Sequence, residues 1–209
     1  HADRGIAEDP APASQLLQGI TTAVVGQDGG WERPVGDQMR RLGAVRPALN
    51  FALFSGHGGL RSHVMGSDFR REATAAEIDR MAHLLDADMT AGALGLSSGL
   101  EYDPGYYSNQ AELEALAKVA ARHGGMAISH VRDEANSAFE AFEELAAVAR
   151  GAGLPAQISH IKLGSAAVWG RAEDVLARFL RPYAAPRRPR QHSAHRVHAR
   201  TALGRPNPC

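Results

Sequence analysis

Two histidines stand in closely similar local sequences, His130 in ISHVRDE and His160 in ISHIK, and 30 residues separate them. A short apolar run precedes each one, and this separation is about the length of one strand-helix repeat. Two such histidines on neighbouring parallel strands would point at one site. Neutral imidazole nitrogens together with a carboxylate suit Zn2+, and a catalytic zinc site keeps a position open for water. One such histidine alone is more simply a polar cap at a strand end, but the matched pair favours a metal site.

Two further polar residues follow apolar runs nearer the start of the chain. Asp28 follows the run 20–25 in GQDGG, and His57 follows the run 49–54 in SGHGGLR. Asp28 is either a carboxylate ligand of a metal or a turn residue before two glycines. His57 and Arg61 share one motif, for which a loop-stabilising pair is the simpler interpretation and a place near the substrate is the alternative.

The elements that would position these residues repeat the order of short apolar strand, loop and amphipathic helix, which is typical of a parallel α/β architecture. The expected strands are 20–25, 49–54, 93–97, 126–129 and 156–159, and the expected helices are 74–91, 110–122, 137–150 and 171–179. Gly124, Gly151 and Gly153 lie where helix C-caps are expected. Periodicity fits both an open doubly wound sheet and part of a barrel. Polar groups at the carboxyl ends of the strands favour the barrel, because a (β/α)8 barrel gathers its catalytic residues there.

Length and composition set the broad class. The 209 residues fall short of the roughly 250 that a closed (β/α)8 barrel uses. No apolar run approaches the ~20 residues of a membrane helix, so we expect no membrane partner. The only cysteine is Cys209, which excludes an internal disulfide and suits a cytoplasmic protein. The chain begins at His1 without an initiator Met, and we therefore expect that the start of a larger protein is missing.

The neutral net charge hides a division near residue 180. Residues 180–209 hold seven arginines and no Asp, Glu or Lys, so this tail carries +7 and residues 1–179 carry −7. An arginine-rich arm that binds nucleic acid is one interpretation of the tail. A shift of the reading frame near Phe179 is the interpretation we prefer, because it explains why lysines and acidic residues vanish at one point. We therefore expect a partial barrel over 1–179, and a tail over 180–209 that is disordered or out of frame.

Five motifs, taken together, resemble one known family. GITTAVVGQDGG, SGHGGLRSHVMG, ALGLSSGLEYDPGYYS, SHVRDE and QISHIK occur in the order shown by the N-acyl-D-amino-acid deacylase (D-aminoacylase) branch of the amidohydrolase superfamily. The resemblance spans essentially all of residues 1–179. It implies a TIM-type (β/α)8 barrel joined to a small β-sandwich, with one or two Zn2+ ions that serve hydrolysis of N-acyl-D-amino acids. This chain would supply about strands 2 to 6, without the first and last strands or the sandwich.

The resemblance also implies roles for particular residues. His130 and His160 match the two histidine ligands after the fifth and sixth strands, and Asp28 stands where many relatives place a cysteine ligand. His1 opens the sequence His-Ala-Asp, which matches the second half of the family's His-x-His-x-Asp motif, and Asp3 would then close that motif. The family's catalytic aspartate, a general acid/base, follows the eighth strand and has no counterpart before Cys209. We therefore expect no catalytic residue in this chain.

The remaining candidates are neighbours of the motif residues. Arg132, Asp133 and Glu134 would orient His130 or cap the helix that follows. Lys162 would meet a substrate carboxylate or serve as a loop cation. Tyr102, Tyr106 and Tyr107 would line the substrate entrance or pack their own loop.

The expected function is therefore metal-dependent hydrolysis of the amide bond of a small N-acyl-D-amino acid by the intact form, with little activity in the 209-residue chain alone. Two alternatives stay open. One is a non-catalytic metal-binding or interaction protein on a degenerate amidohydrolase scaffold, and the other is a nucleic-acid binder that uses the arginine tail. The sequence does not specify the oligomeric state.

Overall fold

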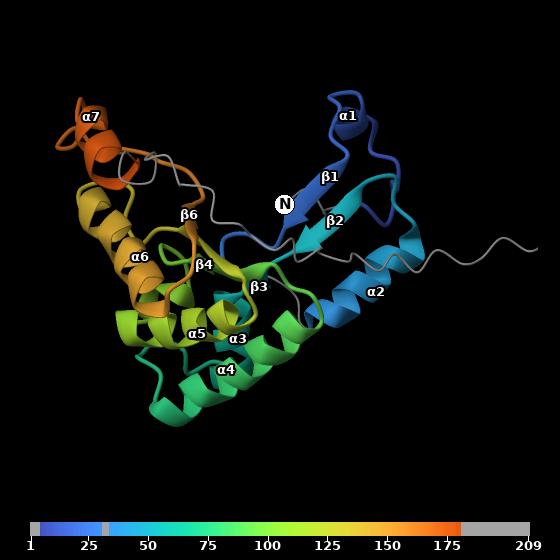
Figure 1. Ribbon diagram of the computed structural model, residues 1–209, viewed down its shortest axis with the longest axis horizontal. Helices are drawn as coiled ribbons and strands as arrows, with labels where there is room; N and C mark the ends of the chain where they lie inside the picture. Colours follow the sequence, from blue (N-terminus) through green and yellow to red (C-terminus); the bar gives the residue numbers. More distant parts are fainter. Residues whose placement is uncertain (1–4, 31–33, 181–209) are drawn as a thin grey trace, which may run out of the picture.

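The structure is a computed structural model that describes residues 5–30 and 34–180. These residues form a parallel α/β unit (Figure 1). His1, Asp3 and residues 181–209 lie outside the described residues, and so do the expected roles of His1 and of the arginine tail.

The strands of the described residues form two parallel sheets, one of two strands and one of four. The strands are β1 (Thr22–Val25), β2 (Asn50–Leu53), β3 (Ser55–Gly56), β4 (Gly95–Gly99), β5 (Met126–His130) and β6 (Ala156–Ile158). β1 pairs with β2, and β3 to β6 pair in sequence order. A single residue, Phe54, separates β2 from β3, so the run 50–56 pairs with β1 along its first half and with β4 along its second. A doubly wound sheet reverses its strand order at a switch point, whereas this order never reverses.

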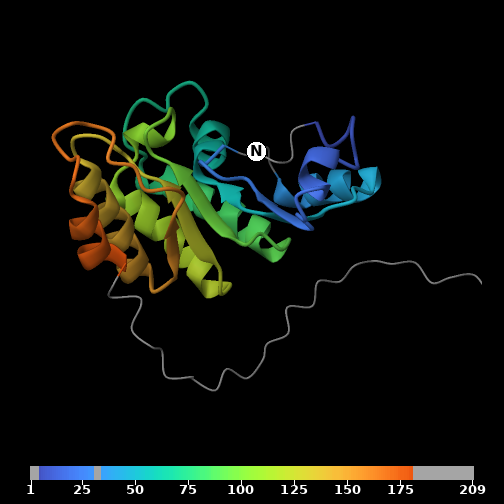
Figure 2. The same cartoon turned by 90° about the horizontal axis from the view of Figure 1, so that it is seen from above.

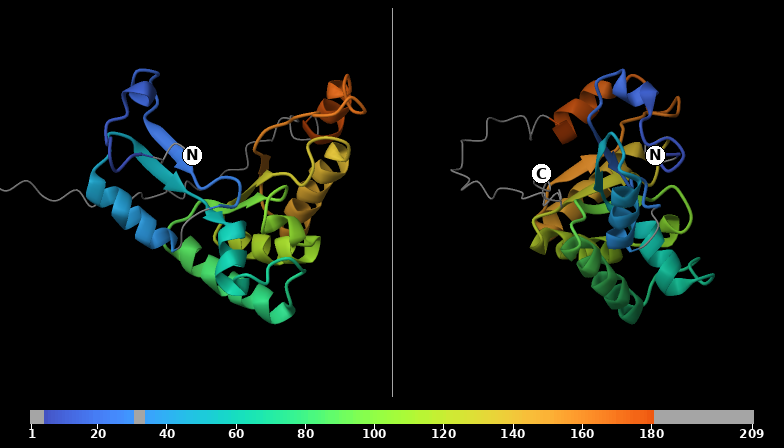
Figure 3. Two further views of the ribbon diagram at one scale, coloured as in Figure 1. Left: turned by 180° about the vertical axis from the view of Figure 1, so that it is seen from behind. Right: turned by 90° about the vertical axis from the view of Figure 1, so that its right-hand side faces the viewer.

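Helices alternate with these strands. They are α1 (Ala13–Leu16), α2 (Val35–Val45), α3 (His57–Met65), α4 (Ala75–Thr90), α5 (Gln110–Arg122), α6 (Ala138–Ala152) and α7 (Ala172–Val175), with a 3-10 turn at Gly105–Tyr107 and a π turn at Leu176–Leu180. Figures 1 and 3 show α3, α4, α5 and α6 gathered on one face of the strands. The β1–β2 pair with α2 lies at one end of the described unit, and α6 and α7 lie at the other (Figure 2). Helices on a single face are expected of a barrel sector, because the other face of a barrel sheet lines its interior.

Local sequence explains where the main helices begin. Thr74 caps α4 through a capping box in which its hydroxyl accepts from the Glu77 amide while the Glu77 carboxylate accepts from the Thr74 amide. Asn109 caps α5 by accepting from the amide of Glu112 at 3.0 Å. Both caps lie within a residue of the helix starts expected from the sequence.

Several local expectations were wrong. His57 was expected in a loop, but it begins helix α3. The sequence did not indicate this helix because Gly58 and Gly59 follow His57 and glycine disfavours helix interiors. Gly151 lies inside α6 and is not a C-cap, whereas Gly153 at φ +70° ends this helix as expected. The strand expected at 93–97 lies two residues later, and the expected helix 171–179 is a short α-helix followed by a π turn.

The core lies between the strands and the helices α3 to α6. Leu53 and Leu96 from the strands pack with Met81, Leu85 and Leu116 from the helices, and all five are buried. A second cluster joins α6 to the last described helix through Phe142 and Phe179. Within the described residues, β1 and β6 each pair with one neighbour. No helix among these residues is long and apolar enough to cross a membrane.

Candidate metal centre

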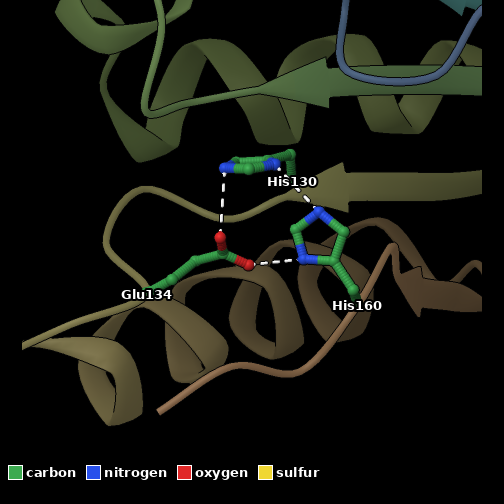
Figure 4. A group of neighbouring side chains, drawn as sticks. All are labelled: His130, Glu134 and His160. Atoms are coloured by element: carbon green, nitrogen blue, oxygen red, sulfur yellow. Dashed lines mark hydrogen bonds and ion pairs between the residues drawn. The ribbon is translucent and has the colours of Figure 1, made fainter. Parts of the chain in front are cut away.

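His130 and His160 meet at the carboxyl ends of two adjacent parallel strands. His130 is the last residue of β5, and His160 follows the end of β6 by two residues. The pairing of Ser129 with Ile158 sets this register, and the Ser159 amide extends it by donating to the Ser129 carbonyl at 2.9 Å. The expected convergence of the two histidines is therefore present (Figure 4).

The two imidazoles meet through one nitrogen each. His130 Nδ1 lies 3.1 Å from His160 Nε2, and the rings are nearly perpendicular at 85°. Two nitrogens that bind one tetrahedral zinc at 2.0–2.1 Å are about 3.3 Å apart. The observed separation thus fits two ligands of one ion.

Glu134 completes a group of three potential metal donors with these histidines. It lies four residues after His130, and its side chain is 8% exposed. Glu134 Oε1 lies 2.5 Å from His160 Nδ1, while Oε2 lies 3.4 Å from His130 Nε2 and 2.5 Å from Lys162 Nζ. The close contact with His160 lacks the direction of a hydrogen bond, so both atoms are buried without a hydrogen-bond partner. Two imidazoles and a buried carboxylate are donor types that suit a divalent cation.

Two residues that follow β4 also contact His130. Glu101 Oε2 lies 2.7 Å from His130 Nε2, and Tyr102 Oη lies 3.2 Å from Nδ1. The Leu100 amide donates to the His130 carbonyl at 3.0 Å, which ties this segment to the end of β5. Burial raises the pKa of Tyr102, and the negative charges of Asp28 and Glu101 raise it further. Sequence reasoning missed Glu101, because nothing in the GLEYDPG motif marks its glutamate as a neighbour of a histidine 29 residues away.

Asp28 lies at the carboxyl end of β1, as expected. It is half-buried and adopts φ +60°, a conformation that Asp tolerates better than most residues. Its carbonyl packs so closely on Gly99 that a side chain at Gly99 would collide with it. Gly99 pairs with His130, so the Asp28 backbone lies near the end of β5, although Asp28 is not part of the three-residue donor group. Ligation by Asp28 stays a prediction.

His57 and Arg61 form a buried cluster with Glu112 of α5. All three side chains are at most 1% exposed. His57 Nε2 lies 2.7 Å from Glu112 Oε1, Arg61 Nη1 donates to Glu112 Oε2, and Arg61 Nη2 donates to the carbonyls of residues 69 and 71. Burial raises the pKa of Glu112, but the hydrogen bonds and charges of His57 and Arg61 outweigh it and hold this pKa below its ordinary value. These contacts tie α3 to α5, and a role near the substrate stays a prediction.

Arg132 and Asp133 were expected to orient His130 or to cap the helix that follows, and their contacts differ. Asp133 accepts from the amides of Ala135 and Ser137 and so shapes the turn before α6. Arg132 donates to Glu144 and to the carbonyls of Tyr106 and Ser108. Lys162 contacts Glu134, and this hydrogen bond raises the pKa of its ammonium group. Its expected contact with a substrate carboxylate stays a prediction.

Known proteins are similar to this chain in sequence and in fold. No protein-family model matches the chain. An N-acyl-D-glutamate deacylase from Alcaligenes xylosoxydans xylosoxydans is 35% identical over an alignment 207 residues long, which covers 88% of this chain and 42% of the relative. A second relative is the N-acyl-D-glutamate deacylase from Bordetella bronchiseptica, whose crystal structure contains zinc and a phosphonate inhibitor. Its sequence is 37% identical to this chain, and the two folds agree with a TM-score of 0.78 over 84% of this chain and 41% of that protein. A D-aminoacylase structure described as defining a novel subset of amidohydrolases is 32% identical with a TM-score of 0.78, over 85% and 42% of the two chains.

These similarities place the described residues within a (β/α)8 barrel of the amidohydrolase class. The chain belongs to the D-aminoacylase family of N-acyl-D-amino-acid deacylases. It spans about 42% of the length of the curated N-acyl-D-glutamate deacylase it matches.

Proposed function

We propose that this chain forms the metal-binding sector of a hydrolase that cleaves the amide bond of N-acyl-D-amino acids. The observation that carries the proposal is the pair of imidazole nitrogens 3.1 Å apart at the ends of β5 and β6, in a chain related to N-acyl-D-amino-acid deacylases. His130 and His160 would hold Zn2+, in keeping with the zinc bound by the related Bordetella bronchiseptica structure. Asp28 is the further ligand we propose. A zinc ion held there would act as a Lewis acid toward the acyl carbonyl and would activate water.

The surrounding residues would bind and orient the substrate. Lys162 is 53% exposed, and its ammonium group is the cation beside the donor group, so we propose that it attracts the substrate carboxylate. Glu134 already partners this lysine at 2.5 Å and would hold it near the two histidines. Tyr102, which is 46% exposed and touches His130, would line the substrate entrance. We also propose a cytoplasmic location, supported by the absence of cysteine before position 209.

We further propose that the chain alone hydrolyses its substrate poorly. The related N-acyl-D-glutamate deacylase devotes more than half of its length to segments that this chain does not match. The proton that the leaving amine requires would have to come from a general acid supplied by those segments. Robust turnover by the purified 209-residue chain would contradict this part of the proposal.

A chimera tests the function directly. Residues 20–179 replace the matching segment of the N-acyl-D-glutamate deacylase relative, and hydrolysis of N-acetyl-D-glutamate, N-acetyl-D-aspartate and their L enantiomers is measured. We expect D-selective hydrolysis that His160→Ala abolishes. The matched control is His63→Ala, which removes an exposed histidine on α3 and should leave the rate unchanged. A folded chimera that binds zinc but hydrolyses none of these amides would favour a non-catalytic metal-binding protein instead.

A further inference from the structure

Both imidazoles at the metal centre have a carboxylate at the nitrogen that points away from the other ring. His130 and His160 face each other through Nδ1 and Nε2, at 3.1 Å. Behind them, His130 Nε2 lies 2.7 Å from Glu101, and His160 Nδ1 lies 2.5 Å from Glu134. The two contacts differ in kind, because the one with Glu101 has hydrogen-bond geometry and the one with Glu134 does not.

We propose that Glu101 is a positioning residue, which acts on the metal through His130. This inference rests on the proposed zinc site. A neutral imidazole carries its proton on one nitrogen and a lone pair on the other. Because the Glu101 carboxylate can only accept when ionised, it favours the tautomer with the proton on Nε2. The lone pair is then on Nδ1, the nitrogen that faces His160.

The position of Glu101 excludes a direct ligand role. Its carboxylate contacts His130 Nε2, on the opposite side of the ring from His160, and Glu101 is not part of the donor group formed by the two histidines and Glu134. A residue that ligated the ion would have to lie close to the facing nitrogens. Glu101 therefore reaches the metal only through the imidazole, as an outer-shell carboxylate does.

The backbone holds Glu101 in place, although its side chain is 47% exposed. On one side the Leu100 amide bonds to the His130 carbonyl. On the other side Arg132 donates to the carbonyls of Tyr106 and Ser108 at 2.6 and 3.0 Å, and the Ser108 hydroxyl donates to the Gly105 carbonyl at 2.7 Å. The contact with His130 thus comes from a segment fixed at both ends.

The test measures zinc affinity by competition with a chromogenic chelator, using the 209-residue chain and two variants. Glu101→Ala should weaken zinc binding about 10- to 100-fold, which is typical for loss of an outer-shell partner. Glu101→Gln should weaken it less, because an amide oxygen still accepts the Nε2 proton. Asp103→Asn is the matched control, since Asp103 lies on the same segment, is 49% exposed and contacts Arg70 rather than a histidine. Its zinc affinity should equal that of the parent chain.

The visible spectrum of the Co2+-substituted protein separates positioning from ligation. We expect the bands of Glu101→Gln to keep their wavelengths, since the ligand set does not change. Shifted bands would make Glu101 a ligand and overturn the inference. Equal zinc affinities of Glu101→Ala and the parent, or equal losses in the Ala and Gln variants, would overturn it as well.

The parent chain separates this inference from the proposed function. If the parent binds zinc in a way that depends on His160 and Glu101→Ala binds equally well, only the positioning role fails. If the parent binds no zinc, the proposed function and this inference fail together. Circular dichroism of the metal-free variants shows whether each one folds like the parent.

Discussion

The guanidinium group of Arg132 binds the carboxylate of Glu144 on α6, with Nη2 2.8 Å from Oε1 and Nε within 3.2 Å of both oxygens. The same side chain bonds to two carbonyls of the segment after β4. One arginine at the end of β5 therefore joins a helix to the segment that carries Glu101 and Tyr102.

Replacement of Arg132 should affect both stability and the metal centre. In Arg132→Met, Glu144 loses its partner while it is 17% exposed, and two carbonyls lose their donors. We expect a loss of about 2 kcal/mol in the free energy of unfolding, measured with urea. Arg150→Met is the control, because the ion pair of Arg150 with Glu143 lies on the surface and contributes little. A loss no larger than that of the control would show that Arg132 does not anchor the segment.

Removal of either histidine should abolish specific zinc binding. His130→Ala and His160→Ala each remove one of the two facing nitrogens, and we expect less than one zinc per chain after dialysis against a weak chelator. Metal content by mass spectrometry is the measurement. His63→Ala should retain the parental stoichiometry, and unchanged metal content in both ligand variants would place the ion elsewhere.

Exchange of Asp28 for cysteine tests whether this position reaches the metal. Thiolate sulfur is a softer ligand than carboxylate oxygen, so Asp28→Cys should increase the preference for Zn2+ over Mn2+. The Co2+-loaded variant should also show a near-ultraviolet sulfur-to-cobalt charge-transfer band. Because the chain ends in Cys209, the variant is made together with Cys209→Ser. Absence of the band in a folded, cobalt-loaded variant would remove Asp28 from the ligand set.

The cluster of His57, Arg61 and Glu112 should make the free energy of unfolding depend on pH in the acidic range. The folded-state pKa of Glu112 lies below its unfolded value, which is about 4.3. Its carboxylate therefore stabilises the fold fully above pH 4.3, and this contribution is lost as the pH falls through the lower folded-state pKa. Glu112→Gln leaves the Arg61 charge buried without its partner, at a cost of about 3 kcal/mol at pH 7.

The difference in unfolding free energy between the parent and Glu112→Gln should shrink as the pH falls below about 4.3. Urea titrations at several pH values measure it. A difference that stays constant as the pH falls would mean that Glu112 does not titrate with folding. Glu143→Gln is the control, since that surface carboxylate should give only a small difference throughout.

The meeting of His130 and His160 was predictable because each histidine directly follows its own apolar strand, a pattern that is visible in the sequence. A repeat of 30 residues and matched apolar runs were enough to place His130 beside His160, and the structure confirms that these residues meet. The parallel α/β class and the partial barrel were also correct.

Other features depend on contacts between distant segments, which periodicity does not encode. Glu101 reaches His130 only because β4 and β5 pair and the segment after β4 folds back. Glu112 lies in the first turn of α5, where an acidic residue has an ordinary explanation in the helix dipole, so its pairing with His57 and Arg61 left no signal. The helix at His57 was missed because its two glycines favour a loop by propensity, whereas tertiary packing overrides that preference.

The interruption of the strand run at Phe54 has a geometric consequence. Residues 50–53 pair with β1, whereas residues 55 and 56 pair with β4, so the two neighbours of this run are displaced along it relative to each other. Such stagger tilts strands against a common axis, and a closed barrel requires a fixed total of it, the shear number. Part of that shear is already set by this register. Strands that extend the sheet from β1 or β6 would therefore join a surface whose tilt is already established.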